Sequence, residues 1–346
     1  MKIKITGIII MVIFAGTLIF YTCGKSQPQT DNQIYIGVAC YDQKDTFIEE
    51  LVDAFKEQCS SMESKDYAIS MTIMDASNSQ RVQNDQIEQM INDGCNVLCV
   101  NLADRTEPSE IIDAAKEKDI PIIFFNREPV EEDMRRWDKL YYVGGKAKQS
   151  GELQGELAAD FIKVNPQADR NNDGKIQYVI LEGEMGHQDA IIRTESVVES
   201  LKANDISLEK LSYQIANWNR VQAQNRMMQL IGQYNNRMEV VLANNDAMAL
   251  GAMDAYEKLG YTETNRPAFF GIDGTKEGLE AVKDGTLAAT VYNDKEGQAA
   301  AMANLAFSIA TEDENNPNPF KNYKYIYRAY QKVTKENVQT FLEKEE

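Results

Sequence analysis

The feature that most constrains the fold is the alternation of short apolar runs with segments of helical periodicity, which starts near residue 34. The runs that we predict as strands of a first series are Tyr35–Cys40, Ala68–Met74, Val97–Asn101, Pro121–Asn126 and Tyr141–Gly144. Helical periods lie between them, at Thr46–Cys59, Ser79–Asp93 and Pro108–Lys118. Near-continuous apolar strands that alternate with helices are typical of parallel sheets covered on both faces.

A second series of the same kind follows. Its strand and helix candidates alternate in the order Ile176–Leu181, Ile191–Asn204, Leu211–Ala216, Val221–Tyr234, Val240–Asn244, Ala247–Lys258, Ala268–Ile272 and Lys276–Lys283. The chain has 346 residues, enough for two domains of ordinary size. The sequence therefore predicts an α/β protein with two doubly wound, Rossmann-like lobes.

We expect the chain to pass between the lobes three times. The predicted crossings lie near Ile120–Pro121, Tyr292–Lys295 and Ile326–Gln331. The predicted parts are a signal peptide at 1–23, a tether at 24–33, a first lobe at 34–120 plus 293–328, and a second lobe at 121–292 plus 329–346. Three crossing segments of this kind can act together as a hinge.

The amino terminus predicts export. Met1–Lys4 carries positive charge, and Ile8–Phe20 has no charged residue. This run is shorter than the about 20 residues of a transmembrane helix, but it suits a signal peptide. Cys23 follows in a position that resembles the lipidated cysteine of bacterial lipoproteins, although Phe20–Thr22 departs from the usual pattern before it. We expect a lipid anchor at Cys23, with an uncleaved apolar anchor as the alternative, and either places the folded part outside the cytoplasmic membrane.

Charge and cysteine spacing exclude other classes of protein. The net charge of −18 argues against a nucleic-acid partner, which requires clustered Lys and Arg. Cys40, Cys59, Cys95 and Cys99 lack the spacing of a zinc site or of a disulfide hairpin. We predict that these four residues are buried free thiols.

Short polar side chains follow the predicted strands in both series. They are Tyr41, Asp45, Asn101 and Asn126 in the first series, and Asn245, Asp246, Asp273 and Asn293 in the second. Each could be only a helix cap or a turn residue. However, ligands of open α/β sheets bind beyond the carboxyl ends of the strands. A ring of short amides and carboxylates there suits a neutral polyhydroxyl ligand, because each hydroxyl both donates and accepts.

The sequence also resembles a known family, the periplasmic galactose/glucose-binding proteins of ABC transport and chemotaxis. The resemblance runs from about Ile34 to the carboxyl end and is strongest at Asn84–Ile87, Phe124–Pro129, Tyr141–Gly144, Ala243–Ala249 and Phe270–Asp273. It implies a periplasmic binding protein type I fold and a monomer that closes on D-galactose or D-glucose. It also implies an ABC permease as the partner, and a chemoreceptor or sensor kinase as a further one.

The resemblance places the sugar contacts at named positions. These are Asp45, Phe47, Asn101, His187, Asp189, Arg193, Trp218, Asn245, Asp273 and Asn293. Elementary chemistry agrees with this assignment, because the flat rings of Phe47 and Trp218 can cover the two C–H faces of a pyranose. Carboxylates form strong hydrogen bonds to hydroxyls, and Arg193 offers a planar fork of donors.

A second motif lies apart from these residues. Residues 169–177 match the front of an EF-hand calcium loop, but the glutamate expected at position twelve is missing. The resemblance supplies that glutamate from Glu239, and the alternative is a solvated Asn/Asp turn. The predicted Ca²⁺ ligands, with a structural role, are Asp169, Asn171, Asp173, Lys175, Gln177 and Glu239.

Three other functions remain as rivals. A sugar-responsive repressor would need a DNA-binding amino terminus, which the apolar export segment replaces. A glycosidase would need a protonated acid beside a nucleophile or base, and we expect no catalytic residues here. A receptor of the same fold for another sugar, such as a pentose or a methyl galactoside, feeding a sensor rather than a transporter, is the nearest alternative.

Overall fold

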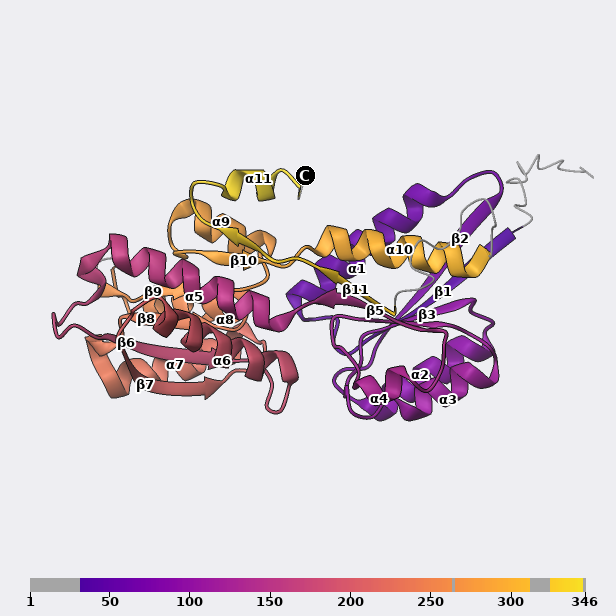
Figure 1. Ribbon diagram of the computed structural model, residues 1–346, viewed down its shortest axis with the longest axis horizontal. Helices are drawn as coiled ribbons and strands as arrows, with labels where there is room; N and C mark the ends of the chain where they lie inside the picture. Colours follow the sequence, from indigo (N-terminus) through magenta and orange to yellow (C-terminus); the bar gives the residue numbers. More distant parts are fainter. Residues whose placement is uncertain (1–31, 263–264, 312–323, 345–346) are drawn as a thin grey trace, which may run out of the picture.

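The computed structural model describes residues 32–262, 265–311 and 324–344, which form two lobes (Figure 1). The predicted signal peptide, Cys23 and most of the tether at 24–33 lie outside the described residues. Within the described part, none of the helices combines the length and the apolar character that a membrane crossing requires.

The first lobe is built on a six-stranded parallel sheet with the order β11-β5-β4-β3-β1-β2. Its strands are β1 (Asn32–Cys40), β2 (Tyr67–Asp75), β3 (Val97–Val100), β4 (Ile122–Phe125), β5 (Leu140–Gly145) and β11 (Tyr325–Arg328). Its helices are α1 (Thr46–Met62), α2 (Gln80–Asn92), α3 (Ser109–Glu117), α4 (Glu131–Met134) and α10 (Lys295–Thr311). Alternate side chains of β1 point to opposite faces, so Val38 packs with α1 and α10, whereas Ala39 packs with α2 and α3.

The second lobe has a four-stranded parallel sheet with the order β7-β6-β8-β9 and a small antiparallel pair, β10-β12. The strands are β6 (Ile176–Glu182), β7 (Leu208–Ile215), β8 (Val240–Ala243), β9 (Ala268–Phe270), β10 (Thr290–Tyr292) and β12 (Gln331–Val333). The helices α5 (Ala147–Val164) and α6 (Gln188–Ala203) pack on one face of the sheet. The other face is covered by α7 (Arg220–Tyr234), α8 (Asp246–Lys258), α9 (Lys276–Asp284) and α11 (Val338–Leu342). Short 3-10 turns follow α5 and α7, at Pro166–Ala168 and Asn235–Arg237.

The predicted fold class is confirmed, and so is the burial of the four free cysteines, Cys40, Cys59, Cys95 and Cys99. The boundary at 120/121 is wrong. Strand β4 pairs with β3, and β5 pairs with β4, so both belong to the sheet of the first lobe. The chain first leaves this lobe between Gly145 and Ala147, where β5 ends and α5 begins. An apolar run shows that a strand forms, but not which strand it pairs with.

The other two crossings lie between β10 and α10 and between β11 and β12. The described part of the first lobe is therefore 32–145 with 295–311 and 324–328, and that of the second is 147–262 with 265–292 and 331–344. Three segments link the lobes, and they converge between them (Figure 1).

Candidate functional site

A cavity lies between the lobes, at the carboxyl ends of the strands of both sheets. Its lining is Tyr41, Asp45, Phe47, Asn126, Arg127, His187, Asp189, Arg193, Trp218, Asn245 and Asp273. The first five residues belong to the first lobe and the other six to the second. The structure thus brings together eight of the ten predicted sugar contacts, from segments up to 228 residues apart (273 − 45).

The two remaining predicted contacts, Asn101 and Asn293, are buried but do not line the cavity. Asn101 Nδ2 donates to the Phe125 carbonyl (3.2 Å) and to Asn126 Oδ1 (3.1 Å), so that Asn126 stands at the surface of the cavity instead. Asn293 Oδ1 accepts from Gln298 Nε2 (2.7 Å). Asn101 Oδ1 has no hydrogen-bond partner in the part of the chain that the structure describes.

Tyr41, Asn126 and Arg127 also line the cavity. The predicted polar ring included Tyr41 and Asn126, but the resemblance named neither as a sugar contact, and Arg127 was missed altogether. A signal for them was present. Tyr41 and Asn126 each come directly after an apolar strand, and Arg127 lies in one of the segments that carry the family resemblance. What was missing was the direction of each side chain, which depends on its neighbours in space.

On the first lobe, Asp45 is fixed as the N-cap of α1. Its Oδ1 accepts from the backbone N–H groups of Phe47 (3.0 Å) and Ile48 (3.3 Å), and the Tyr41 hydroxyl donates to Oδ2. The Arg127 guanidinium stacks 3.6 Å from the centre of the Tyr41 ring. Burial raises the pKa of Asp45, while the Tyr41 hydrogen bond and the Arg127 charge act in the opposite direction.

On the second lobe, Trp218 packs against the backbone of Gly183, and we call this position the seat of Trp218. Only glycine leaves enough room there. A Cβ at Gly183 would come within 2.2 Å of the indole Cζ2, so the ring lies against bare backbone. His187 meets the indole edge-on, with ring centroids 5.3 Å apart, and the Arg193 guanidinium lies 5.7 Å from it. Asn245 Nδ2 donates to the Trp218 carbonyl (3.3 Å). The indole is therefore held in one orientation before any ligand arrives.

His187 is held in its neutral form. Burial, helped by the charges of Arg127, Arg193 and Arg105, keeps the pKa of His187 well below its ordinary value. Its Nδ1 accepts the backbone N–H of Asp189 (3.1 Å). A neutral imidazole that accepts at Nδ1 carries its proton on Nε2, so the ring presents one donor.

Arg193 and two carboxylates form the charged part of the second wall. Arg193 Nη1 donates to the Asn244 carbonyl (2.7 Å) and lies 3.7 Å from Asp273 Oδ1, while Nη2 donates to the Tyr330 hydroxyl (3.2 Å). Burial raises the pKa of Asp189 and Asp273, and the Arg193 charge opposes that rise. The buried Arg193 Nε has no partner within the described residues. An unpaired buried donor costs about 1–3 kcal/mol, which a ligand oxygen can recover.

The cavity is small in this form of the protein. Its volume is about 30 Å³, room for only a few water molecules, against roughly 300–1,000 Å³ for typical ligand pockets. A ligand of the size of a sugar therefore has to enter through a more open form. The three linking segments allow that motion, because each lobe keeps its own sheet and core.

The predicted calcium loop folds into a compact turn. Gly174 has a φ of +76°, and the turn is closed by Asp169, whose Oδ2 accepts the Gly174 N–H (2.9 Å). Asp173 Oδ2 lies 3.0 Å from both Asn171 Nδ2 and Gln177 Nε2. Glu239 reaches in from the start of β8, and its two oxygens accept the N–H groups of Arg170 (2.7 Å) and Gln177 (2.9 Å).

Hydrogen bonds thus link all six predicted ligand residues within one turn and its neighbouring strand, namely Asp169, Asn171, Asp173, Lys175, Gln177 and Glu239. In the described ranges, no three His, Cys, Asp or Glu side chains are grouped so as to hold a metal ion. Amide and backbone oxygens would have to complete the set, as they do in loops of this type. The metal site stays a prediction.

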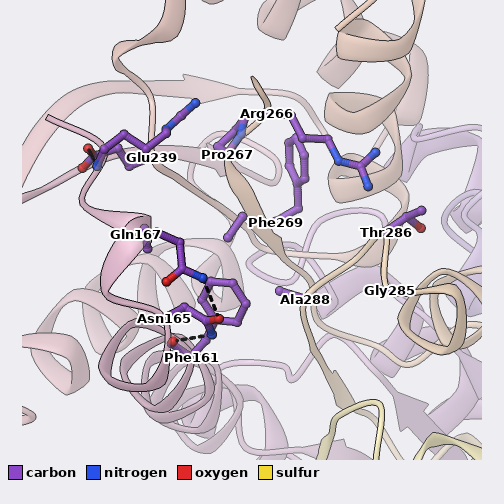
Figure 2. Close-up of a pocket in the computed structure, with 13 residues that line it drawn as sticks. Phe161, Asn165, Gln167, Glu239, Arg266, Pro267, Phe269, Gly285, Thr286 and Ala288 are labelled. Atoms are coloured by element: carbon purple, nitrogen blue, oxygen red, sulfur yellow. Dashed lines mark hydrogen bonds between the residues drawn. The ribbon is translucent and has the colours of Figure 1, made fainter. Parts of the chain in front are cut away.

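A larger cavity, of about 300 Å³, lies at the opposite end of the second sheet, beside the starts of β8 and β9 (Figure 2). Phe161, Phe269 and Ala288 give it apolar walls, and Glu239 and Arg266 lie at its edge. It contains none of the predicted sugar contacts. Of four cavities compared within the described residues, the smaller one between the lobes has the polar ring that suits a sugar.

Comparisons with known proteins agree with this architecture. A D-galactose/methyl-galactoside binding periplasmic protein of Haemophilus influenzae is 35% identical over 308 residues, 89% of each chain. A xylitol-binding protein of Mycolicibacterium smegmatis is 28% identical over 89% of this chain and 79% of its own. An ABC transporter solute binding protein of Bacillus halodurans, solved with bound myo-inositol, superimposes with a TM-score of 0.75 at 29% identity, covering 90% of this chain and 98% of its own.

These three relatives are named as binding proteins and not as enzymes, which favours the predicted non-catalytic role. Residues 36–314, most of the chain, match the family described as periplasmic binding protein domain. With the two-lobed fold and the cleft between the lobes, this match is decisive: the chain belongs to the periplasmic binding protein family.

Proposed function

We propose that this protein is an exported receptor that binds D-galactose or D-glucose between its lobes and delivers the sugar to an ABC permease. The observation that carries the proposal is the composition of the cleft. Phe47 on one lobe and Trp218 on the other line it together with carboxylates, amides and Arg193. The name of the Haemophilus influenzae relative, which refers to D-galactose and methyl galactoside, favours a hexose.

Binding works by closure of the hinge. Asp45 and Phe47 meet the sugar from the first lobe, and His187, Asp189, Arg193 and Trp218 meet it from the second. Only a closed form offers both sets at once, so the sugar shifts the equilibrium by its differential affinity for that form. A permease that contacts both lobes would then recognise the closed shape.

The test is calorimetric titration of the full chain with D-galactose, D-glucose, methyl galactoside, ribose, xylose and arabinose. We expect micromolar or tighter binding of D-galactose or D-glucose and at least tenfold weaker binding of the pentoses. A pentose lacks a hydroxymethyl group, and a missing polar group leaves a buried partner unpaired. Tight binding of a pentose alone would contradict the proposal.

A receptor of the same fold for a different polyol is the second candidate. It is favoured by the xylitol-binding relative and by the structural relative with bound myo-inositol. The cleft chemistry suits any neutral polyhydroxyl ring or chain, so xylitol and myo-inositol belong in the same titration. Binding of either at least tenfold tighter than that of both hexoses would select this candidate.

We also propose that the loop at 169–177 holds Ca²⁺ together with Glu239, and that the ion stabilises the second lobe without contacting the sugar. Oxygen ligands at alternate loop positions, with a left-handed glycine between them, support this role. Chelation should lower the thermal stability and leave sugar affinity unchanged.

Export with a lipid at Cys23 completes the proposal, with an uncleaved apolar anchor as its alternative. The test is incorporation of labelled palmitate by the producing cells. A labelled wild type and an unlabelled Cys23→Ser variant are expected, and equal absence of label in both would favour the uncleaved anchor.

A further inference from the structure

An ion pair joins the two lobes across the mouth of the cleft. Arg127 Nη2 lies 2.8 Å from Glu184 Oε2, and the two side chains are 4% and 39% exposed. Arg127 follows β4 in the sheet of the first lobe, whereas Glu184 follows β6 in the sheet of the second. The two residues can therefore meet only when the lobes lie close together.

We propose that Arg127 and Glu184 form a latch that stabilises the closed form and sets how tightly the cleft holds its ligand. This inference rests on the proposed function and deepens it, because it names two positioning residues that the family resemblance did not assign. The pair adds a contact between the lobes that does not depend on which hydroxyls the sugar carries.

Arg127 is prepared for this contact by the first lobe alone. Its Nη1 donates to the Ala103 carbonyl (2.8 Å), and its guanidinium stacks on the Tyr41 ring. The Tyr41 hydroxyl in turn donates to Asp45. A side chain that is already fixed loses little entropy when its partner arrives, so more of the ion-pair energy is available for closure.

Glu184 connects the latch to the second wall of the cleft. It stands directly after Gly183, the seat of Trp218, and its carbonyl accepts the N–H of His187 (3.1 Å). When Arg127 holds Glu184, it therefore also fixes the loop that positions an aromatic wall and the predicted histidine contact. The Arg127 charge also opposes the burial that raises the pKa of Asp45 and Asp189, so it favours their ionised forms.

The test is a double-mutant cycle on the full chain, with titrations of D-galactose and D-glucose. Glu184→Gln removes only the charge of a half-exposed side chain, and we expect it to raise Kd by about three- to tenfold. Arg127→Met should raise Kd at least as much, and the double variant should be no worse than Arg127→Met, because the partners act as one unit. Additive effects, or an unchanged Kd in Glu184→Gln, would overturn the latch.

The dependence of the Kd on ionic strength distinguishes the latch from a general packing effect. The sugars are neutral, so a wild-type Kd that rises with ionic strength reports charges of the protein, and this rise should be lost in Glu184→Gln. The matched control is Asp113→Asn, which breaks an ion pair of the same length (2.8 Å) to Arg136 inside the first lobe. The control should leave both the Kd and its salt dependence unchanged.

Small-angle scattering on the sugar-free protein distinguishes the failure of the latch from the failure of the proposed function. At low salt, Glu184→Gln should have a larger radius of gyration than the wild type, because its lobes separate more often. If the wild type binds neither sugar but this difference is present, the hexose proposal fails and the latch stands. Equal radii of gyration would contradict the latch.

Discussion

Acidic side chains lie at both ends of the second lobe's sheet, but their surroundings and hydrogen-bond partners differ. At the carboxyl ends of the strands, the buried Asp273 and the half-buried Asp189 lie beside Arg193, whose Nε has no partner in the described structure. At the amino ends, Asp169 and Asp173 accept hydrogen bonds from backbone amides of their own loop. Unused hydrogen-bond capacity in a buried place indicates a ligand site, whereas a turn that satisfies itself indicates a structural role.

The backbone shows the same contrast. In the cleft, the non-glycine residues Trp218 and Asp273 have φ values of +59° and +119°. In the loop, the left-handed positions are Asn172 and Gly174, residue types that adopt this region at little cost. Strain is thus stored at the cleft, where it aims side chains, and avoided at the loop.

Replacing Trp218 by alanine should have the largest effect. We expect Trp218→Ala to raise the Kd for D-galactose or D-glucose by about 10- to 100-fold, because one face of the sugar loses its aromatic wall. The melting temperature without sugar should change little, since the indole is only partly buried. Calorimetry and thermal melts check both parts, and normal binding would show that Trp218 is not a stacking platform.

Gly183→Ala should come next, with a rise in Kd of about tenfold, because the new Cβ forces the indole to shift. A change in tryptophan fluorescence should accompany it. The control is Gly232→Ala, on α7, where an added Cβ meets nothing within 4 Å. Similar Kd values for the two variants would show that the seat of Trp218 tolerates a methyl group.

At the other end of the sheet, the prediction concerns stability and not affinity. Calcium at about ten times its Kd should stabilise the wild type by about 1.4 kcal/mol, which raises its melting temperature by about 2 °C. Glu239→Gln should abolish this rise and leave sugar affinity unchanged. An equal calcium response in both proteins would remove Glu239 from the ligand set, and a change in sugar affinity would contradict the separation of the two ends.

The smallest expected effect is a difference in pH dependence. Burial raises the pKa of Asp246, at the start of α8, to about 7, and the charges of Glu50 and Asp273 lie near it. The pKa of Asp246 is higher in the folded state than in the unfolded state. Its contribution to the free energy of unfolding therefore falls as the pH rises through 7, by about 1 kcal/mol between pH 6 and pH 8. Thermal melts of Asp246→Asn should lack this fall.

The loop carboxylate Asp173 should behave in the opposite way. Backbone hydrogen bonding from Lys175 lowers its pKa, so the stability that it contributes is present above its unfolded value and is lost as the pH falls through the folded value. Melts in the presence of a chelator should show a flatter acid limb for Asp173→Asn. If both variants flatten the same limb, the contrast between the two ends is wrong.

The sequence by itself determined the elements, the fold class and most of the cleft. Strands and helices leave local periodic signals, and the short side chains that follow strands must lie at the carboxyl edge of a parallel sheet. For this reason Asp45, Asn245 and Asp273 could be assigned to the cleft from the order of residues alone. The roles of His187 and Trp218 came from the family resemblance and not from any local pattern.

Only the tertiary structure decided to which lobe β4 and β5 belong. It also decided that Asn101 and Asn293 do not line the cleft, and that Arg127 contacts Glu184. Each of these facts depends on contacts between residues far apart in the chain. Strand pairing is chosen by the whole sheet, and the direction of a side chain is chosen by what packs around it. No local pattern of residues contains that information.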